Sequence, residues 1–379
     1  MRKIAFITER RADYSRFKPI LDLIKKDTEL DYTLVVTGAH LMKKYGHTID
    51  VIKKDGFKVA AEIPIFDEDF DDTGAEMVRG IGRILVDLPT ILEKEKPDIV
   101  LAGFDLGPNL AIAITGSHMN IPVFHLQGGE VTGSIDESLR HATTKFAHVH
   151  LASNDDAVKR LIRMGENPKY VFNVGCTSLD VIRNAKKISK ETITKRYGLD
   201  PSRPYVIIIQ HPITTEVEKA TRQILETIKA VKSLGVQSLF IYPNTDAGNK
   251  KILKEIENST IKYVPFLDLE DYANLLKYSS ALVGNSSSGI HETCFLHVPT
   301  VNIGSRQQGR LRPENVIDVD HNKEKIKSAI KKALYNEKFL AKVRRCKSPY
   351  GDGRSAQRVI KVLKSVKITP ELIQKKITY

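Results

Sequence analysis

The sequence has no tryptophan and only three cysteines among its 379 residues, Cys176, Cys294 and Cys346. This odd number without a CxxC spacing predicts neither a disulfide framework nor a zinc site, and it fits a reducing compartment. No apolar run is long enough to span a bilayer, and the apolar stretch at the N-terminus is too short for a signal peptide. We therefore expect a cytoplasmic protein without a membrane partner.

Two phosphate-binding fingerprints are also missing, because neither a GxGxxG nor a GxxxxGK[ST] motif occurs. The formal net charge of +13 nevertheless favours an anionic partner. Aromatic residues do not interleave with the basic runs, which argues against a nucleic-acid partner. These observations favour a small anionic ligand, and they predict no metal and no bound cofactor.

Short hydrophobic strands alternate with helices in two successive blocks. Such alternation predicts parallel sheets covered by helices on both faces, so we expect an α/β chain with two doubly wound, Rossmann-like domains facing each other across a cleft. Residues 176–204 are the best candidate for the linker between them, and Gly235 should end a helix that begins near residue 214. The strands are predicted at residues 3–8, 32–38, 98–103, 122–127, 148–153 and 170–175, and then at 205–210, 238–244, 261–265, 281–285 and 299–304.

Ligands of such sheets bind beyond the carboxyl ends of the strands, so the residues after each strand are the candidates. Arg11 and Ser15 follow the first strand, where a helix N-terminus attracts anions, although a capped helix with a surface arginine is the alternative. Ser286 and Ser287 could hold a diphosphate and Glu292 a ribose diol. A serine cap followed by an early glutamate would explain the same residues.

Further polar residues end other strands. His211 could lie against a phosphate or donate a proton, although a structural role would also explain a lone histidine. Asp105 could be a functional carboxylate or a turn former. Asn244 and Arg306 follow two other strands of the second block.

The stretch "HLQGGEVTGSIDESLRHA" at residues 125–142 is unusually rich in ionisable groups. Its "SIDE" segment predicts a capping box, with Ser134 as N-cap and Glu137 as the third helical residue. That box explains neither Glu130 nor Asp136. Carboxylates and imidazoles grouped in this way suit proton transfer. Two pairs stand four residues apart and could meet on one helix face, Asp136 with Arg140 and Glu137 with His141.

Five separated motifs resemble one known family, the hydrolysing UDP-N-acetylglucosamine 2-epimerases of sialic acid biosynthesis, which are related to the non-hydrolysing 2-epimerases. The motifs are "RADYS", "GGEVTGSIDESLRHA", "HPITTE", "YPNTDAG" and "GNSSSGIHE". The resemblance implies a GT-B-like fold with an N-terminal domain at 1–178, a nucleotide-binding domain at 179–353 and a C-terminal helix at 354–379 that returns to the first domain. It also implies a homodimer or homotetramer.

The implied activity converts UDP-N-acetylglucosamine to N-acetylmannosamine and UDP, by elimination to a glycal and rehydration, without a cofactor. By resemblance, Asp105, Asp136 and Glu137 fall at catalytic positions, with His211 near the leaving diphosphate. The residues that would contact the nucleotide sugar are Arg11, Ser15, His211, Asn244, Ser286, Ser287, Glu292 and Arg306.

Two positions depart from the family pattern. Gln127 stands at a catalytic position where the family commonly has an acid, so Glu130 or Glu137 would take that role. Leu106 follows Asp105 where the family commonly has arginine. The alternatives are the same chemistry on a UDP- or GDP-linked diacetamido-trideoxyhexose, a non-hydrolysing 2-epimerase, a GT-B glycosyltransferase, and a weakly active protein that binds sugar nucleotides.

Overall fold

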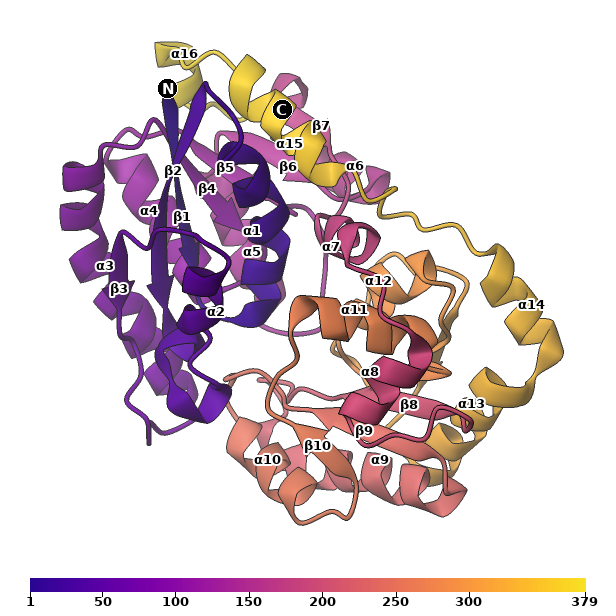
Figure 1. The fold of residues 1–379 in the computed structure, drawn as a ribbon. Coiled ribbons are helices and arrows are strands. Elements are labelled where there is room, and N and C mark those ends of the chain that lie inside the picture. Colours follow the sequence, from indigo (N-terminus) through magenta and orange to yellow (C-terminus); the bar gives the residue numbers. More distant parts are fainter. The chain divides into compact units, whose positions relative to one another are not determined.

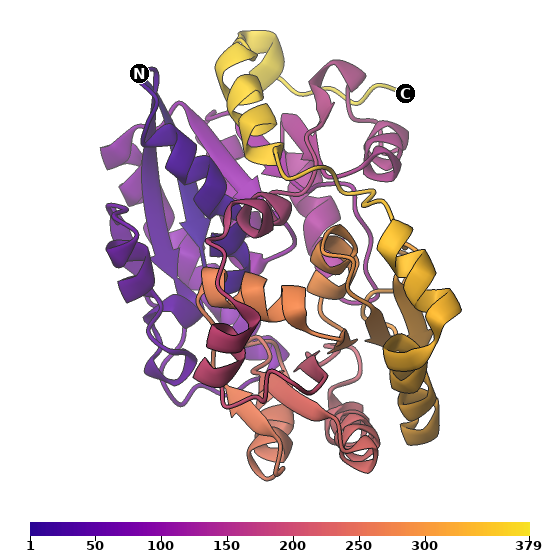
Figure 2. The same cartoon turned by 45° about the vertical axis from the view of Figure 1, so that its right-hand side comes forward.

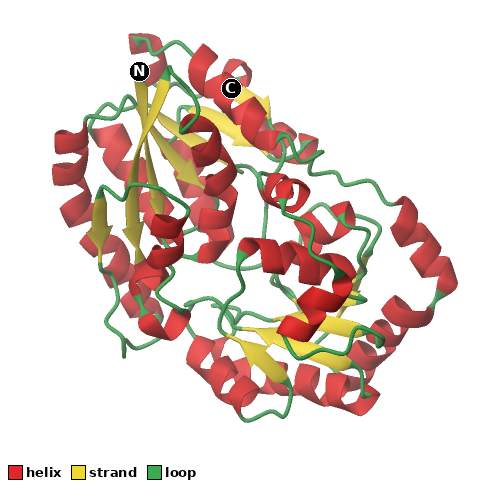
Figure 3. Ribbon diagram, in the orientation of Figure 1, coloured by secondary structure: helices red, strands yellow, loops and turns green.

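The computed structural model describes residues 1–379 and divides the chain into two compact units. The first unit contains residues 1–130, 135–180 and 350–379, and the second contains residues 131–134 and 181–349. Each unit holds one parallel sheet with helices on both faces (Figure 3), as the alternation of strands and helices predicted. No helix combines the length and the apolar character needed to cross a membrane.

The first unit is built on seven parallel strands in the order β3-β2-β1-β4-β5-β6-β7 (Figure 1). The sequence predicted six of them and missed β3, whose three residues show no clear apolar run. The strands are β1 (Arg2–Thr8), β2 (Leu30–Thr37), β3 (Ala61–Ile63), β4 (Ile99–Gly103), β5 (Val123–Leu126), β6 (Val149–Ala152) and β7 (Val171–Asn173).

Helices cover the first sheet and close two clusters of buried apolar side chains. The C-terminal helix α15 packs against α1 and contributes Ala356, Val359 and Leu363 to the cluster that also holds Phe6 and Phe17. Figure 2 shows α15 in yellow beside the first sheet. The helices are α1 (Arg11–Ile24), α2 (Ile49–Lys54), α3 (Gly74–Glu95), α4 (Gly107–His118), α5 (Asp136–Phe146), α6 (Asp155–Arg163), α15 (Ser355–Ser365) and α16 (Pro370–Ile373).

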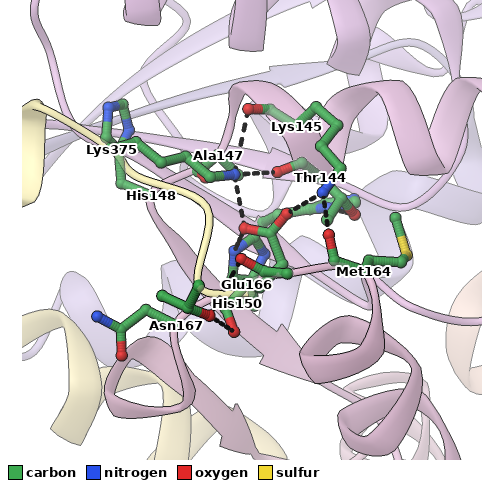
Figure 4. Close-up of polar contacts among 12 residues, drawn as sticks. Thr144, Lys145, Ala147, His148, His150, Met164, Glu166, Asn167 and Lys375 are labelled. Carbon is green, nitrogen blue, oxygen red and sulfur yellow. Dashed lines mark hydrogen bonds and ion pairs between the residues drawn. The ribbon is translucent and has the colours of Figure 1, made fainter.

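After α16, the C-terminal segment is fixed by a buried charged cluster (Figure 4). The Lys375 ammonium group lies 2.6 Å from a carboxylate oxygen of Glu166, which also accepts hydrogen bonds from His150 at 2.9 Å and Lys145 at 2.8 Å. Lys375 also donates to three carbonyls at the C-terminal end of α5, those of Thr144, Lys145 and Ala147. The end of the chain is thereby attached to α5.

The second unit is built on six parallel strands in the order β10-β9-β8-β11-β12-β13. Five strands were predicted, and β13 was missed because Asp318, which is exposed, interrupts its short apolar run of partly buried residues. The strands are β8 (Tyr205–Ile209), β9 (Gln237–Ile241), β10 (Lys262–Val264), β11 (Ala281–Gly284), β12 (Thr300–Ile303) and β13 (Val316–Val319).

The helices of the second unit include α8, which lies within the predicted linker at 176–204. The interpretation of that whole stretch as a linker was wrong, because Ile193 and Leu199 are buried in a core cluster with β8 and β9. Gly235 ends α9 in the left-handed conformation, as predicted. The helices are α8 (Lys190–Arg196), α9 (Ala220–Leu234), α10 (Asn249–Glu257), α11 (Leu269–Tyr278), α12 (Ser288–Phe295), α13 (Lys323–Tyr335) and α14 (Glu337–Arg345), and α7 (Ser178–Asn184) spans the division between the units.

Candidate functional site

The turn that follows β4 has a strained backbone and carries Asp105. Phe104 adopts a φ of 66°, which non-glycine residues seldom do and which clusters at functional sites. His125 holds this turn, because its Nε2 lies 3.1 Å from the Phe104 carbonyl and its Nδ1 lies 3.1 Å from Thr144 Oγ1. Burial lowers the pKa of His125 to about 3, so the ring is neutral, with Nε2–H donating to the carbonyl.

Asp105 forms an ion pair with Arg140 of α5. The Arg140 side chain is 2% exposed and that of Asp105 is 14% exposed, so the pair is largely shielded from water. Nε and Nη1 of Arg140 are buried and make no hydrogen bond. The sequence had suggested Asp136 as a partner for Arg140 on the same helix face, but the guanidinium reaches Asp105 instead. It brings a cation to Asp105 that Leu106 cannot supply.

Gln127 follows β5 and is buried, with a φ of 60°. Its Nε2 donates to Cys176 Sγ at 3.1 Å and lies 3.4 Å from Glu130 Oε1. Glu130 is also buried and accepts a hydrogen bond from Ser153 Oγ. The structure therefore brings Gln127 and Glu130 together in one polar cluster at the carboxyl end of β5.

Helix α5 begins at Asp136, directly after the predicted cap residue Ser134 and Ile135. Ile135 has a helical conformation and its side chain makes no cap. Ser134 belongs to residues 131–134 of the second unit, where the neighbouring Gly133 N–H donates to the Arg306 carbonyl at 3.0 Å. The Oε1 atom of Glu137 lies 3.8 Å from His141 Nε2, so these two side chains meet on one helix face, as predicted. Asp136 is the first residue of the helix.

Arg11 and Ser15 lie in the first turns of α1, as expected. Asp13 caps this helix, because its carboxylate accepts the backbone N–H groups of Glu9 and Arg10 at 2.9 Å each. The hydroxyl of Ser15 donates to the Ala12 carbonyl at 2.8 Å. Arg11 is partly buried, so it is not the surface arginine of the simpler interpretation.

In the second unit, His211 lies at the carboxyl end of β8 and is 7% exposed. Its backbone N–H donates to Asn285 Oδ1 at 2.7 Å, and Asn285 Nδ2 donates to the His211 carbonyl at 2.9 Å. The backbone N–H of Asn244 donates to His211 Nδ1 at 3.1 Å. Because Nδ1 accepts this hydrogen bond, the proton of the neutral ring lies on Nε2.

The turn after β11 leads into α12 with Ser287 as N-cap residue. Ser286 Oγ accepts the Ser288 N–H at 3.3 Å, whereas the side chain of the N-cap residue Ser287 makes no cap. Glu292 is 6% exposed, and its Oε2 is buried without a hydrogen-bond partner. A buried carboxylate oxygen without a partner is costly, and it suits a site that receives hydroxyl groups from a ligand.

Arg306 lies beside the same turn. Its Nη1 is 3.3 Å from the Asn285 carbonyl, which also accepts a hydrogen bond from Gln307 Nε2 at 2.8 Å. The second sheet therefore brings His211, Asn244 and Arg306 close to Asn285 at its carboxyl edge. The serines that follow Asn285 belong to the same group.

Several residues of these clusters were not predicted. Asn285, Gln307 and Ser153 were missed, although Asn285 and Ser153 each directly follow a strand and could have been found by that rule. Cys176 was noted only as a cysteine. No group of three or more histidine, cysteine, aspartate or glutamate side chains could hold a metal ion.

Comparisons with known proteins agree with this architecture. A family model described as UDP-N-acetylglucosamine 2-epimerase matches residues 22–364. The chain is 35% identical to a UDP-N,N'-diacetylbacillosamine 2-epimerase (hydrolyzing) of Legionella pneumophila over 99% of both chains. It is 33% identical to a UDP-N-acetylglucosamine 2-epimerase of Neisseria meningitidis over 90% of both chains.

A crystal structure of a Neisseria meningitidis UDP-GlcNAc 2-epimerase bound to UDP-GlcNAc matches this fold with a TM-score of 0.82 at 17% identity, covering 95% of this chain and 99% of that one. The expected GT-B-like α/β fold is thus confirmed. Because the family model spans most of the sequence, the chain belongs to the UDP-N-acetylglucosamine 2-epimerase family.

Proposed function

We propose that the protein is a hydrolysing 2-epimerase, which converts a UDP-linked 2-acetamido sugar to the free 2-epimer and UDP. The observation that carries the proposal is the ion pair between Asp105 and Arg140 on a strained turn at the carboxyl end of β4. It supplies an oriented carboxylate, which this chemistry requires, at the edge where such sheets bind their ligands.

The first step is an elimination. The C2–H bond has no neighbouring carbonyl, and a carboxylate with an ordinary pKa of about 3.9 is too weak a base to break it in the unreacted sugar. Cleavage of the C1–O bond must therefore be more advanced than removal of the C2 proton, because positive charge at C1 acidifies C2–H. Asp105 takes the proton, the C2–H electrons form the C1=C2 bond, and the C1–O electrons leave with UDP.

The second step adds water across the glycal. A proton is delivered to C2 from the opposite face, and water adds to C1, which gives the free 2-epimer. Gln127 cannot transfer a proton, and Glu130 is buried in its contacts with Gln127 and Ser153. We assign the second proton transfer to Glu137, whose side chain is 39% exposed and lies beside His141, with Asp136 next to it at the start of α5.

The departing diphosphate needs positive charge and hydrogen-bond donors. In this proposal His211 Nε2–H, Arg306, Ser286, Ser287 and the N-terminus of α12 supply them in the second unit, and Asn244 fixes the His211 ring. Glu292 accepts hydrogen bonds from the ribose hydroxyls. Arg11 and Ser15 would contact the nucleotide from the first unit. The N-terminal domain thus carries the acids and the C-terminal domain the nucleotide site.

Two substrates are candidates. UDP-N-acetylglucosamine, giving N-acetylmannosamine, follows from the sequence motifs. A UDP-linked diacetamido-trideoxyhexose is favoured by the 35% identity over 99% of the chain to a relative named for that sugar. Both sugars carry the 2-acetamido group, so the same chemistry applies to both.

The test is release of UDP from each nucleotide sugar without an acceptor, with the sugar product identified by chromatography. A hydrolysing 2-epimerase releases equal amounts of UDP and free 2-epimer from at least one of them. A product that keeps its UDP would show the non-hydrolysing reaction. A requirement for an acceptor would show a glycosyltransferase, and tight binding without turnover would show a binding protein.

A further inference from the structure

Two of the three cysteines lie side by side in the second unit. Cys294 is in the last turn of α12, and Cys346 directly follows α14. Their Sγ atoms are 2.7 Å apart, and both residues are buried, with 0% and 3% exposure. The two sulfurs are 52 residues apart in the chain, so the tertiary fold brings them together.

The packing around the sulfurs fixes this approach. His297, three residues after Cys294, lies with its Nδ1 3.1 Å from the Val343 carbonyl. The same carbonyl accepts the Cys346 N–H at 3.2 Å, and the Val343 side chain is buried in the core with Phe339. The end of α12 and the end of α14 are thus held together by contacts that do not depend on the sulfurs.

We propose that Cys294 and Cys346 form an oxidative modification site, which closes to an intramolecular disulfide when the protein meets a small disulfide oxidant such as oxidised glutathione. A disulfide has an S–S length of about 2.04 Å, so closure needs only a small side-chain adjustment. The finished bond fits the present positions of the two elements, and the oxidant reaches the buried sulfurs when the ends of α12 and α14 open locally.

The reaction is a thiol–disulfide exchange. The thiolate of one cysteine attacks the oxidant RSSR, which forms a mixed disulfide and releases one thiolate RS⁻. The second cysteine thiolate then attacks the protein sulfur of that mixed disulfide, which forms the Cys294–Cys346 bond and releases the second RS⁻. The two cysteines lose two protons and two electrons, and the oxidant is reduced to two thiols.

The environment predicts a slow reaction. Burial, followed by the contact with Cys346, raises the pKa of the Cys294 thiol, so the thiolate that must react is scarce. The pair therefore stays reduced under ordinary conditions and closes only under sustained oxidation. Once formed, the bond closes the chain from α12 through β12, β13, α13 and α14, which restricts the unfolded chain and stabilises the second unit. The cross-linked helix α12 also carries Glu292, which belongs to the proposed nucleotide site.

Cys176 supplies an internal control. It is buried in the first unit, where it lies 3.1 Å from Gln127 Nε2 and 3.1 Å from Ser178 Oγ. Cys294 and Cys346 contact each other in the second unit, whereas Cys176 contacts Gln127 and Ser178. Cys176 should therefore remain a thiol.

The test uses the full-length native protein, incubated with oxidised glutathione, then denatured and alkylated. We expect one alkylated thiol per chain, at Cys176, and a proteolytic peptide pair that contains the Cys294–Cys346 bond. Reduction with dithiothreitol should restore three alkylated thiols. Three thiols after oxidation, a bond that includes Cys176, or links only between chains would overturn the proposal.

Three cysteine variants test which residues form the bond. Cys176→Ser should still form the bond, whereas Cys294→Ser and Cys346→Ser should each keep two alkylated thiols after oxidation. Oxidised wild type and oxidised Cys176→Ser should unfold thermally about 4 °C or more above their reduced forms. No such shift should occur in Cys294→Ser, and an equal shift there would contradict the site. Circular dichroism shows whether each variant is folded. The peptide map of the wild-type protein tests the proposal even if a variant does not fold.

Discussion

The Arg140 guanidinium of α5 pairs with the Asp105 carboxylate on the turn after β4. This ion pair joins two segments that the sequence analysis had treated separately. Its cation comes from a helix 35 residues further along the chain, rather than from the position next to Asp105. Asp105 therefore has a positively charged neighbour, although Leu106 follows it in place of the arginine that is common in the family.

Replacing Asp105 by asparagine should remove the group that takes the C2 proton. We expect kcat to fall by about 10²- to 10⁴-fold, the usual contribution of a general base. UDP binding, measured by calorimetry, should change little, because the proposed nucleotide contacts lie mainly in the second unit. The matched control is Asp98→Asn, at the opposite end of the same strand, where the carboxylate accepts the Lys3 N–H at 2.8 Å. Near-normal turnover of Asp105→Asn would remove this residue from the mechanism.

Replacing Gln127 by glutamate should destabilise the protein at neutral pH. The new carboxylate would be buried beside Glu130, whose Oε1 is 3.4 Å from Gln127 Nε2, and two like charges cannot share such a site. The loss should be smaller at pH 5 than at pH 7, because protonation of one carboxyl group relieves the repulsion. Thermal unfolding at both pH values measures it. A variant as stable as wild type at pH 7 would contradict this environment for Gln127.

Replacing Lys375 by methionine should weaken the attachment of the C-terminal segment. Glu166 is 1% exposed and keeps two other partners, so we expect a loss of about 3 kcal/mol, near the lower end for breaking a buried ion pair. Urea unfolding measures the change. The exposed neighbour Lys376 provides the control, because Lys376→Met should stay within about 0.5 kcal/mol of wild type. Equal stability of the two variants would show that the cluster does not hold the segment.

Acid should destabilise the first unit well above the pH range in which carboxylates titrate. Burial lowers the pKa of His40 and of His125 to about 3 each, and that of His148 to about 4. The unfolded chain binds protons at these histidines below pH 6.5 while the folded chain does not, so stability is present above pH 6.5 and is lost as the pH falls. Each histidine contributes a slope of up to about 1.4 kcal/mol per pH unit.

The urea midpoint measured at pH 7, 6 and 5 tests this slope. His40→Gln should flatten it, because this variant removes one of the three buried imidazoles. A midpoint that does not move between pH 7 and pH 5 would mean that these histidines titrate normally in the folded protein.

The sequence predicted the two parallel sheets because their strands are continuous apolar runs, such as the fully buried "YVIII" of β8. It missed β3 and β13, whose side chains are mostly partly buried or exposed and show no such run. The rule that ligands bind after strands identified Asp105 and His211 from local order alone.

What the sequence could not supply were contacts set by tertiary packing. Arg140 is four residues from Asp136 on the same helix, so an ion pair with Asp136 was equally compatible with the sequence. The tertiary fold brings Asp105 to Arg140 and decides between the two partners.

The most direct test of the proposed reaction is proton NMR of each candidate UDP-sugar incubated with the protein in D₂O. The account predicts UDP together with a free 2-epimer that carries deuterium at C2, because Asp105 removes the original proton before water adds to the glycal. A free sugar that retains its C2 proton and its original configuration would contradict the account.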